Sequence, residues 1–383
     1  MLAKLSRQSG AIVPPALRQI SIEVAKVGGL NLGQGVCQLP VPSYVLEQAN
    51  AAAREGVNRY TNPRGLESLR LALAKKLSWY NGIDNLDPDR DIVVTCGATG
   101  AFEGLCATLL DPGDEVVVFE PSYPYHVQAL RRYGVDAKFV ALHAPDWSLD
   151  IEEFKAALSP KTKFVLVCTP GNPSGKVFSV QELGALADAY NGLIVTDETY
   201  EHMAFDIPHV SAASLPALAG RVVTIGSYSK TFSITGWRIG YCLAPPALAD
   251  ALTSAVDAIY ACAPAPLQEA VARGIDHFGP EFYKLLNDKY RGKRDRFADG
   301  LQKIGLEPKR PQGAYYMLCG YDKVMPGLSS AEFANKMIMR TGVGAVPSSD
   351  FVRQADKAPW VRFCLALEDD VLEDAMTRLG SLV

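Results

Sequence analysis

The stretch Gly226-Ser227-Tyr228-Ser229-Lys230-Thr231-Phe232-Ser233-Ile234-Thr235-Gly236-Trp237-Arg238-Ile239-Gly240-Tyr241 decides how this chain of 383 residues is interpreted. An apolar run at 222–225 precedes it and a second run, 239–243, ends it; both are typical of buried strands. Lys230, held at the end of a buried strand, is poorly solvated, which disfavours its ammonium form. The neutral amine of such a lysine can form a Schiff base with an aldehyde or a ketone.

Ser227 and Arg238 flank this lysine and are suited to hold a phosphate. A serine hydroxyl can donate a hydrogen bond to phosphate, and a guanidinium can bind it as a charged fork. An aldehyde that carries a phosphate describes pyridoxal 5'-phosphate. The alternative is a surface lysine in a polar loop, which a lone S-x-x-K pattern would favour. The further motifs described below argue against that alternative.

The composition is that of an ordinary globular protein. The chain has 48% hydrophobic and 21% charged residues, and its length favours two compact lobes over one. A net charge of -4 argues against nucleic acid or an anionic membrane as the main partner. The eight cysteines form no C-x-x-C pair, so neither a metal site nor a disulfide framework is expected. With no apolar run of about 20 residues and no apolar leader, a cytoplasmic location is expected.

From Asp91 onward, short apolar runs alternate with helical patterns. This alternation predicts an α/β fold, in which a mostly parallel sheet is covered by helices on both faces. Seven strands are predicted, at 92–95, 115–119, 137–140, 163–168, 193–196, 222–226 and 239–243. Two further strands, at 313–317 and 360–364, and the helices around them predict a smaller second lobe.

The ends of the first two predicted strands carry candidate binding residues, because open α/β sheets bind ligands at the carboxyl ends of their strands. Gly97-Ala98-Thr99 follows the first strand and opens a helix, whose backbone N–H groups can receive a phosphate. A simple strand–helix turn would give the same pattern. Tyr123, just past the second strand, can stack on a flat cofactor ring. A tyrosine that only packs is an equally good reading of this residue taken alone.

Two later strands end in residues that suit a pyridine ring. Asn172, in the turn Thr169-Pro170-Gly171-Asn172-Pro173, can donate a hydrogen bond to a ring phenolate oxygen, although these residue types favour turns in any case. Asp197 ends an apolar strand, and a buried carboxylate needs a cationic partner such as a pyridinium N–H. The alternative, Asp197 as a helix N-cap, explains only one residue. Tyr200 can reach the same phenolate oxygen as Asn172.

Arg362 lies in an apolar context, and a buried arginine normally faces an anion. The α-carboxylate of a substrate and a structural salt bridge are equally good readings of it. Near the N-terminus, Asn31-Leu32-Gly33-Gln34-Gly35 places two glycines close together, which allows the backbone to approach a ligand. A plain turn would also account for that pair.

The set Asn172, Asp197, Tyr200, Lys230 and Arg238 resembles, in order and spacing, the pattern of the class I/II, fold-type I pyridoxal-phosphate-dependent aminotransferases. The similarity runs from about Asn31 to Leu367. The segments 31–35, 169–177 and 230–232 resemble the branch that holds the kynurenine, glutamine and methionine aminotransferases and the cysteine-S-conjugate β-lyases.

This resemblance implies a fold-type I homodimer with shared active sites. A cofactor domain would span 43–278, with 1–42 as an N-terminal arm and part of a small domain, and 279–383 as the rest of that small domain. The cofactor would contact Gly97, Ala98, Thr99, Tyr123, Asn172, Asp197, Tyr200, Ser227, Lys230 and Arg238. Tyr60 would reach the phosphate bound by the neighbouring subunit, and Gly35, Asn172 and Arg362 would bind substrate.

The resemblance also implies a ping-pong reaction that moves an amino group from an L-amino acid to a 2-oxo acid. Lys230 would hold the cofactor as an aldimine and then act as the general acid and base, with Asp197 and Tyr200 as the other catalytic residues. The segment 260–266 lacks the arginine or histidine that acidic-substrate members often place there, although Arg18 can substitute for it. A neutral or aromatic amino donor is therefore expected, with 2-oxoglutarate or another 2-oxo acid as acceptor.

Three rival functions can be set against this interpretation. A β-lyase on the same scaffold would use the same cofactor residues, with elimination of a good leaving group from the substrate. A catalytically silent binding protein would not need all the cofactor residues of the family pattern. Their presence here, Lys230 included, argues against this function. A nucleotide-dependent dehydrogenase would need a G-x-G-x-x-G turn after a strand, and the sequence has none.

Overall fold

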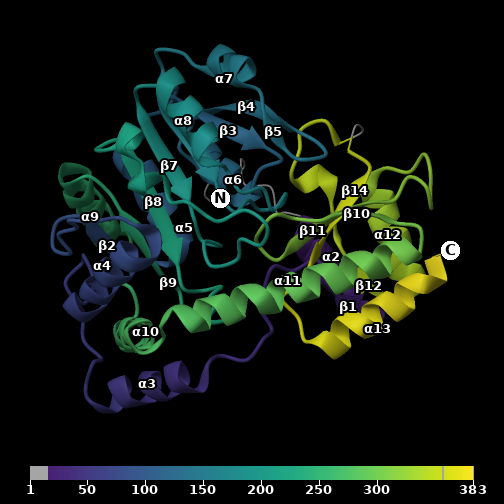
Figure 1. Cartoon of the computed structure of the whole chain (residues 1–383), viewed down its shortest axis with the longest axis horizontal. Helices are drawn as coiled ribbons and strands as arrows, with labels where there is room; N and C mark the ends of the chain where they lie inside the picture. Colours follow the sequence, from purple (N-terminus) through teal and green to yellow (C-terminus); the bar gives the residue numbers. More distant parts are fainter. Residues whose placement is uncertain (1–15, 356–357, 383) are drawn as a thin grey trace, which may run out of the picture.

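The structure of the chain is a computed structural model that describes residues 16–355 and 358–382 (Figure 1). Residues 1–15 of the predicted N-terminal arm therefore lie outside the described residues. The larger sheet has the strand order β2-β9-β8-β7-β6-β3-β4-β5. Its strands are β2 (Ile92–Cys96), β3 (Glu115–Glu120), β4 (Asp136–His143), β5 (Ser148–Leu149), β6 (Thr162–Cys168), β7 (Leu193–Asp197), β8 (Val222–Ser227) and β9 (Ile239–Leu243).

The five central strands, β4, β3, β6, β7 and β8, pair in parallel, whereas β9 runs antiparallel to both β8 and β2. The predicted number of seven strands is wrong by one. The eighth strand, β5, has two residues and pairs antiparallel with the end of β4 at the edge of the sheet. Such a short edge strand leaves no apolar run that a sequence pattern could reveal.

Both faces of this sheet are covered, which explains why its strands are almost continuously apolar. Successive side chains of a strand point to opposite faces. Val116 and Val118 of β3 accordingly pack with one set of helices, and Val117 and Phe119 pack with the other. The first set is α5 (Gly97–Leu109), α6 (Pro124–Arg132) and α9 (Pro246–Tyr260). The opposite face is covered by α7 (Ile151–Ala157), α8 (Val180–Ala189), α4 (Glu67–Asn81) and α10 (Ala265–His277), and α3 (Ser43–Arg54) packs on the outside of α10.

The smaller part of the molecule contains residues from both chain ends, in agreement with the predicted fold class. Its antiparallel sheet has the order β10-β11-β14-β13, with β10 (Glu307–Lys309), β11 (Tyr316–Gly320), β14 (Trp360–Cys364) and β13 (Val346–Pro347). β1 (Leu30–Asn31) pairs in parallel with β12 (Val343–Gly344). The surrounding helices are α2 (Ala16–Lys26), α12 (Ser330–Thr341), α13 (Asp369–Leu379) and the short turns η3 (Ser348–Asp350) and η5 (Gly380–Leu382).

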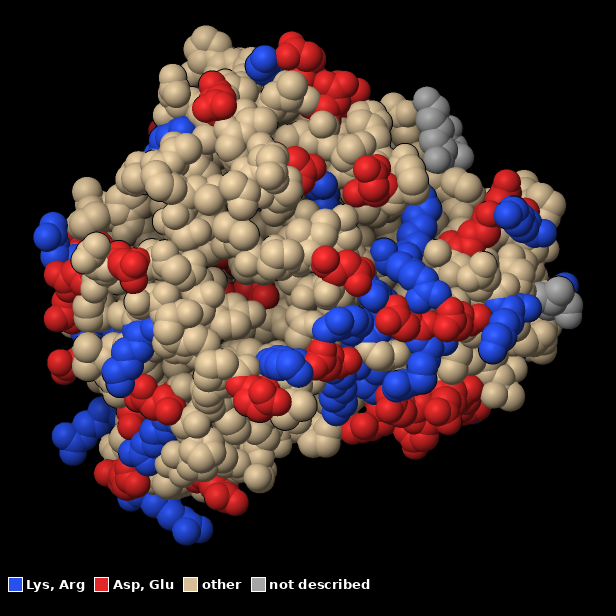
Figure 2. Space-filling model, in the orientation of Figure 1, with Lys and Arg blue, Asp and Glu red and all other residues tan. Residues whose placement is uncertain are grey.

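The long helix α11 (Pro280–Lys303) runs from the larger part of the molecule to the smaller one (Figure 1). Basic and acidic side chains lie side by side along it on the face shown in Figure 2. Arg294 is paired with Asp206, and Lys293 with Asp369 of α13. Among the described residues, no helix combines the length and the apolar composition that crossing a membrane would require.

Candidate active site

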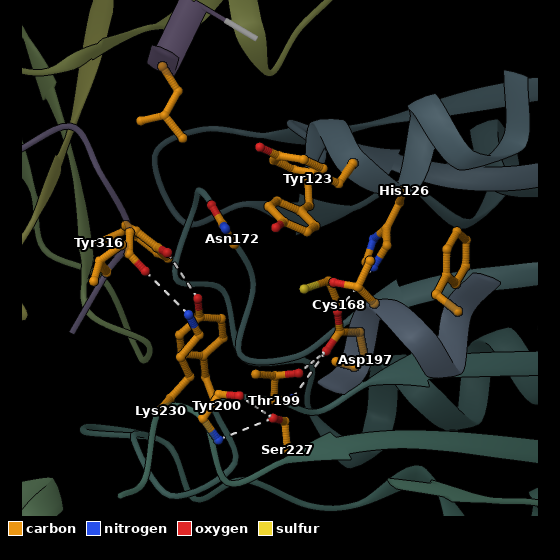
Figure 3. Close-up of a pocket in the computed structure, with 18 of the residues that line it drawn as sticks. Tyr123, His126, Cys168, Asn172, Asp197, Thr199, Tyr200, Ser227, Lys230 and Tyr316 are labelled. Atoms are coloured by element: carbon orange, nitrogen blue, oxygen red, sulfur yellow. Dashed lines mark hydrogen bonds and ion pairs between the residues drawn. The ribbon is translucent and has the colours of Figure 1, made fainter. Parts of the chain in front are cut away.

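A cavity of about 350 Å³ lies where the carboxyl ends of β6, β7 and β8 face the smaller sheet (Figure 3). Its wall contains all but two of the predicted site residues, although they come from distant parts of the chain. These are Gly35, Ala98, Thr99, Tyr123, Asn172, Asp197, Tyr200, Ser227, Lys230, Arg238 and Arg362. The two exceptions are Gly97, which adjoins the wall, and Tyr60.

Lys230 lies three residues after the end of β8 and points into this cavity (Figure 3). Its Nζ donates a hydrogen bond to the backbone oxygen of Gly35 over 3.2 Å. The rings of Tyr200 and Tyr315 lie 5.9 and 5.6 Å from the same nitrogen. Burial lowers the pKa of Lys230 to about 8. The amine is therefore neutral in a larger fraction of molecules than an exposed lysine at the same pH.

Asp197 ends β7 and is buried at the wall of the cavity. Its Oδ2 lies 3.1 Å from Nε2 of His126, and its Oδ1 accepts hydrogen bonds from Oγ1 and N of Thr199. Burial alone would raise the pKa of Asp197, but His126 and Thr199 hold it below its ordinary value. The carboxylate is thus ionised although it is buried, and it can stabilise a positive charge there.

His126 is a site residue that the sequence analysis missed. It lies on α6, one helical turn after Tyr123, and it lines the same cavity. Its ring contacts Phe102 at 4.5 Å and Tyr123 at 5.1 Å between centroids. The spacing of Tyr123 and His126 places both on one helix face. This spacing is the sequence feature that could have identified His126 as a site residue.

One end of the cavity is suited to an anion. Gly97, Ala98 and Thr99 open α5 as predicted, so the helix N-terminus with its free N–H groups points at the cavity. Gly97 has a φ of 69°, and a Cβ at this position would overlap the guanidinium of Arg238. Ser227 Oγ lies 2.9 Å from Ser229 Oγ. A guanidinium, two hydroxyls and a helix N-terminus are together suited to bind a phosphate.

Arg362 of β14 lies at the other end and is 3% exposed. Its Nη1 donates to Oδ1 of Asn172 over 2.8 Å, and its Nη2 donates to the backbone oxygen of Gly33 over 2.7 Å. The guanidinium stacks on the ring of Tyr316 at 4.2 Å. Its buried Nε has no hydrogen-bond partner, and no carboxylate within the described residues forms an ion pair with Arg362. The alternative of a structural salt bridge is therefore not found here.

The contact with Arg362 also fixes the orientation of Asn172. Because Oδ1 of this amide accepts from the guanidinium, its Nδ2 is left to donate into the cavity. Tyr200 O–H lies 3.0 Å from Tyr316 O–H, and burial raises the pKa of Tyr200 well above its ordinary value. Burial also raises the pKa of Tyr316 to about 12, so both tyrosines are neutral, and one of the two hydroxyls donates to the other. Tyr316 was predicted only as part of a strand.

Two predicted contacts lie apart from this cavity. Tyr60 is 87% exposed and does not line the cavity of its own chain. Arg18, considered above as a binder of an acidic side chain, is exposed on α2, whereas its neighbour Leu17 lines the cavity.

The chain is similar to known proteins along most of its length. Residues 27–379 match the family model described as aminotransferase class I and II. Methionine aminotransferase of Escherichia coli is 34% identical, over 95% of each chain. Human kynurenine–oxoglutarate transaminase 3 is 34% identical, over 90% of this chain and 83% of its own. The solved structure of N-succinyldiaminopimelate aminotransferase from Mycobacterium tuberculosis superposes with a TM-score of 0.95 at 32% identity, with both chains fully covered.

Proposed function

Because the chain belongs to the class I and II aminotransferases, we propose that it transfers amino groups from L-amino acids to 2-oxo acids with pyridoxal 5'-phosphate held in the cavity around Lys230. The observation that carries this proposal is the meeting of two groups in one cavity. These are a lysine whose pKa is lowered to about 8 and a carboxylate whose pKa is held low.

The residues of the cavity fit this cofactor. Ser227, Arg238 and the N-terminus of α5 would hold its phosphate, and Asp197 would pair with its ring nitrogen. Tyr123 would lie against the ring, and Asn172 and Tyr200 would donate to its phenolate oxygen. When bound, the cofactor supplies an electron sink for the charge left at the substrate Cα after its proton is removed.

Lys230 has two roles in this proposal. Its neutral amine would hold the cofactor through its aldehyde until an amino acid replaces it. Lys230 Nζ would then be the group that takes up and returns the proton of the substrate Cα. The hydrogen bond from Nζ to the backbone oxygen of Gly35 supports this role, because it directs the amine toward the substrate end of the cavity.

Arg362 would bind the α-carboxylate of both substrates, with Gly35 and Asn172 beside it. The orphaned Nε and the lack of an ion-pair partner among the described residues support this assignment. Leu17, Val36 and Tyr125 also line the cavity, and they favour an amino donor with a neutral or aromatic side chain. The relatives named for methionine and kynurenine support the same class of donor.

The active unit would be a homodimer in which Tyr60 of one subunit contacts the phosphate in the other. Tyr60 is exposed and does not line the cavity of its own chain, which supports a contact with the neighbouring subunit. The eight thiols are free, which supports a reducing cytoplasm as the location.

Absorbance spectroscopy of the purified protein tests the proposed function. With pyridoxal phosphate bound, single amino acids should convert the absorbance of the aldehyde form to that of the amine form, and a 2-oxo acid should reverse the change. No cofactor absorbance after addition of pyridoxal phosphate would refute the proposal. The β-lyase alternative would instead give pyruvate from a cysteine S-conjugate without an added 2-oxo acid; no comparison favours it.

A further inference from the structure

Three of the proposed active-site residues are followed in the sequence by buried polar residues that do not line the cavity. Asp197 is followed by Glu198, Tyr200 by Glu201 and His202, and Lys230 by Thr231. With Lys76 of α4 and His209, these residues form a group that we call the rear cluster: Lys76, Glu198, Glu201, His202, His209 and Thr231. Glu198, Glu201 and His202 are each at most 2% exposed, and Lys76 is fully buried.

The centre of the rear cluster is an ion pair. Lys76 Nζ lies 2.5 Å from Glu201 Oε1, and Asn81, five residues further along α4, donates to Oε2 over 2.8 Å. Burial alone would raise the pKa of Glu201, yet the positive charge of Lys76 brings it down to about 2. This arrangement fastens the segment after Tyr200 to α4. A buried pair adds little net stability over an apolar pair, so its effect lies in fixing position.

His202 joins this segment to the segment that carries Lys230. Its Nδ1 lies 2.8 Å from Oγ1 of Thr231, and both residues are buried. Burial lowers the pKa of His202 well below its ordinary value, so the ring is neutral. Its ring packs against those of Tyr80 and Tyr283, at 4.7 and 4.4 Å between centroids, and these two tyrosine rings also contact each other. The hydrogen bond therefore joins the segment after Tyr200 to the segment that carries Lys230. The tyrosine rings that pack against His202 restrain the position of the bond.

A bound cation is not needed to explain this cluster. Carboxylate and imidazole groups of Glu198, Glu201 and His209 lie close enough together to ligate a metal ion. The ammonium of Lys76 already supplies positive charge at Glu201. The carboxylate of Glu198 has hydrogen-bond donors of its own, since it accepts hydrogen bonds from Oγ1 of Thr196 and the N–H of Ala212.

We propose that Thr231 and His202 are positioning residues for amino transfer. Their hydrogen bond fixes Lys230 relative to Tyr200, and the Lys76–Glu201 pair holds His202 in place. This inference rests on the proposed function of Lys230. Neither residue lines the cavity, so each acts through the backbone of its neighbour. A displacement of about 1 Å in a reacting group can cost 100-fold in rate, so loss of this bond is expected to affect turnover.

Thr231→Val and Thr231→Ser form the first pair of test variants. Valine keeps the branched shape but lacks the hydroxyl, whereas serine keeps the hydroxyl. For Thr231→Val we expect kcat to fall roughly tenfold with KM for the amino acid nearly unchanged. The pH dependence of the bound cofactor's absorbance should shift as well. Thr231→Ser should keep both kcat and the pH dependence of the absorbance close to their wild-type values.

His202→Asn and His202→Leu reach the same bond from the other side, because an asparagine amide can replace Nδ1 whereas leucine cannot. This second pair decides the matter if Thr231→Val does not fold. We expect His202→Asn to lie close to the wild type and His202→Leu to show the lower kcat and the shifted absorbance titration.

Several outcomes would overturn the inference. If the wild type converts amino acids but folded Thr231→Val keeps kcat and the absorbance titration within about twofold of wild-type values, the bond does not position Lys230. Equal losses in His202→Asn and His202→Leu would mean that the ring serves packing alone. If the wild type itself converts no amino acid, the proposed function fails instead.

Discussion

Arg362 Nη1 donates a hydrogen bond to Oδ1 of Asn172 over 2.8 Å, although 190 positions separate the two residues in the sequence. The contact joins β14 of the smaller sheet to the turn after β6 of the larger one. Its two partners would bind the substrate carboxylate and the cofactor ring, respectively. With these proposed roles, the contact would couple substrate binding to the orientation of the cofactor.

Arg362→Lys should weaken amino acid binding, because lysine keeps the charge but loses the planar fork and its contact with Asn172. We expect KM for the amino acid to rise by about 10-fold or more, which corresponds to at least 1.4 kcal/mol. Steady-state kinetics with a saturating 2-oxo acid would measure it. Arg310→Lys, on the surface beside Asp295, serves as the control. An unchanged KM in Arg362→Lys would contradict the assignment.

Lys230→Ala should abolish turnover and leave part of the cofactor bound, because the phosphate contacts of Ser227 and Arg238 remain. Cofactor content after gel filtration and the rate of amino transfer would be measured on the same preparation. Full activity in this variant would refute the role of Lys230. Loss of all cofactor would show that the amine, and not the phosphate end, carries cofactor affinity.

Capture of pyridoxal phosphate by the apo-protein should depend on pH with a midpoint near 8. Burial disfavours the ammonium form and lowers the pKa of Lys230 to about 8, so the neutral fraction of the amine rises as the pH passes through that value. The rate constant of capture, followed by absorbance, should therefore level off above this pH. A midpoint near the ordinary lysine value of about 10.4 would contradict the lowered pKa.

Mixed dimers test the proposed role of Tyr60. Tyr60→Ala and Lys230→Ala should each be impaired, because each variant lacks one component of every site. In a mixed dimer one site would combine the intact Tyr60 of one subunit with the intact Lys230 of the other. Co-refolding the two variants should give more activity than the sum of the separate proteins. No gain, with mixed dimers present by mass spectrometry, would place Tyr60 outside the partner's site.

Lys76→Met should destabilise the fold, because it leaves Glu201 buried without its cationic partner. We expect the free energy of unfolding to fall by about 3–5 kcal/mol, measured by urea denaturation. Lys75→Met is the matched control, since Lys75 lies next on the helix but is exposed and pairs with Asp276 on the surface. It should cost less than about 1 kcal/mol. Equal effects of the two variants would refute the importance of the buried pair.

The predicted family is confirmed by the comparisons, and the predicted fold class agrees with the structure. The seven predicted strands are all present, because each is an apolar run long enough to span a sheet covered on both faces. β5 was missed because two residues carry no periodicity. The roles of the individual site residues remain predictions, although most of these residues line one cavity.

The sequence by itself determined the seven longer strands of the larger sheet and the residues that follow their ends. It also determined that Asn172, Asp197, Tyr200, Lys230 and Arg238 share one family pattern. These features are local, since a strand is read from consecutive side chains and a motif from fixed spacing.

Only the tertiary structure decided that His126 pairs with Asp197, that Arg362 bonds to Asn172, and that Lys76 lies behind the site against Glu201. Each of these contacts joins elements that are distant in the sequence. Which side chains meet depends on the order of strands in the sheet and on the packing of helices across it. No local pattern of the chain records that order, because it follows from burying all the apolar faces together.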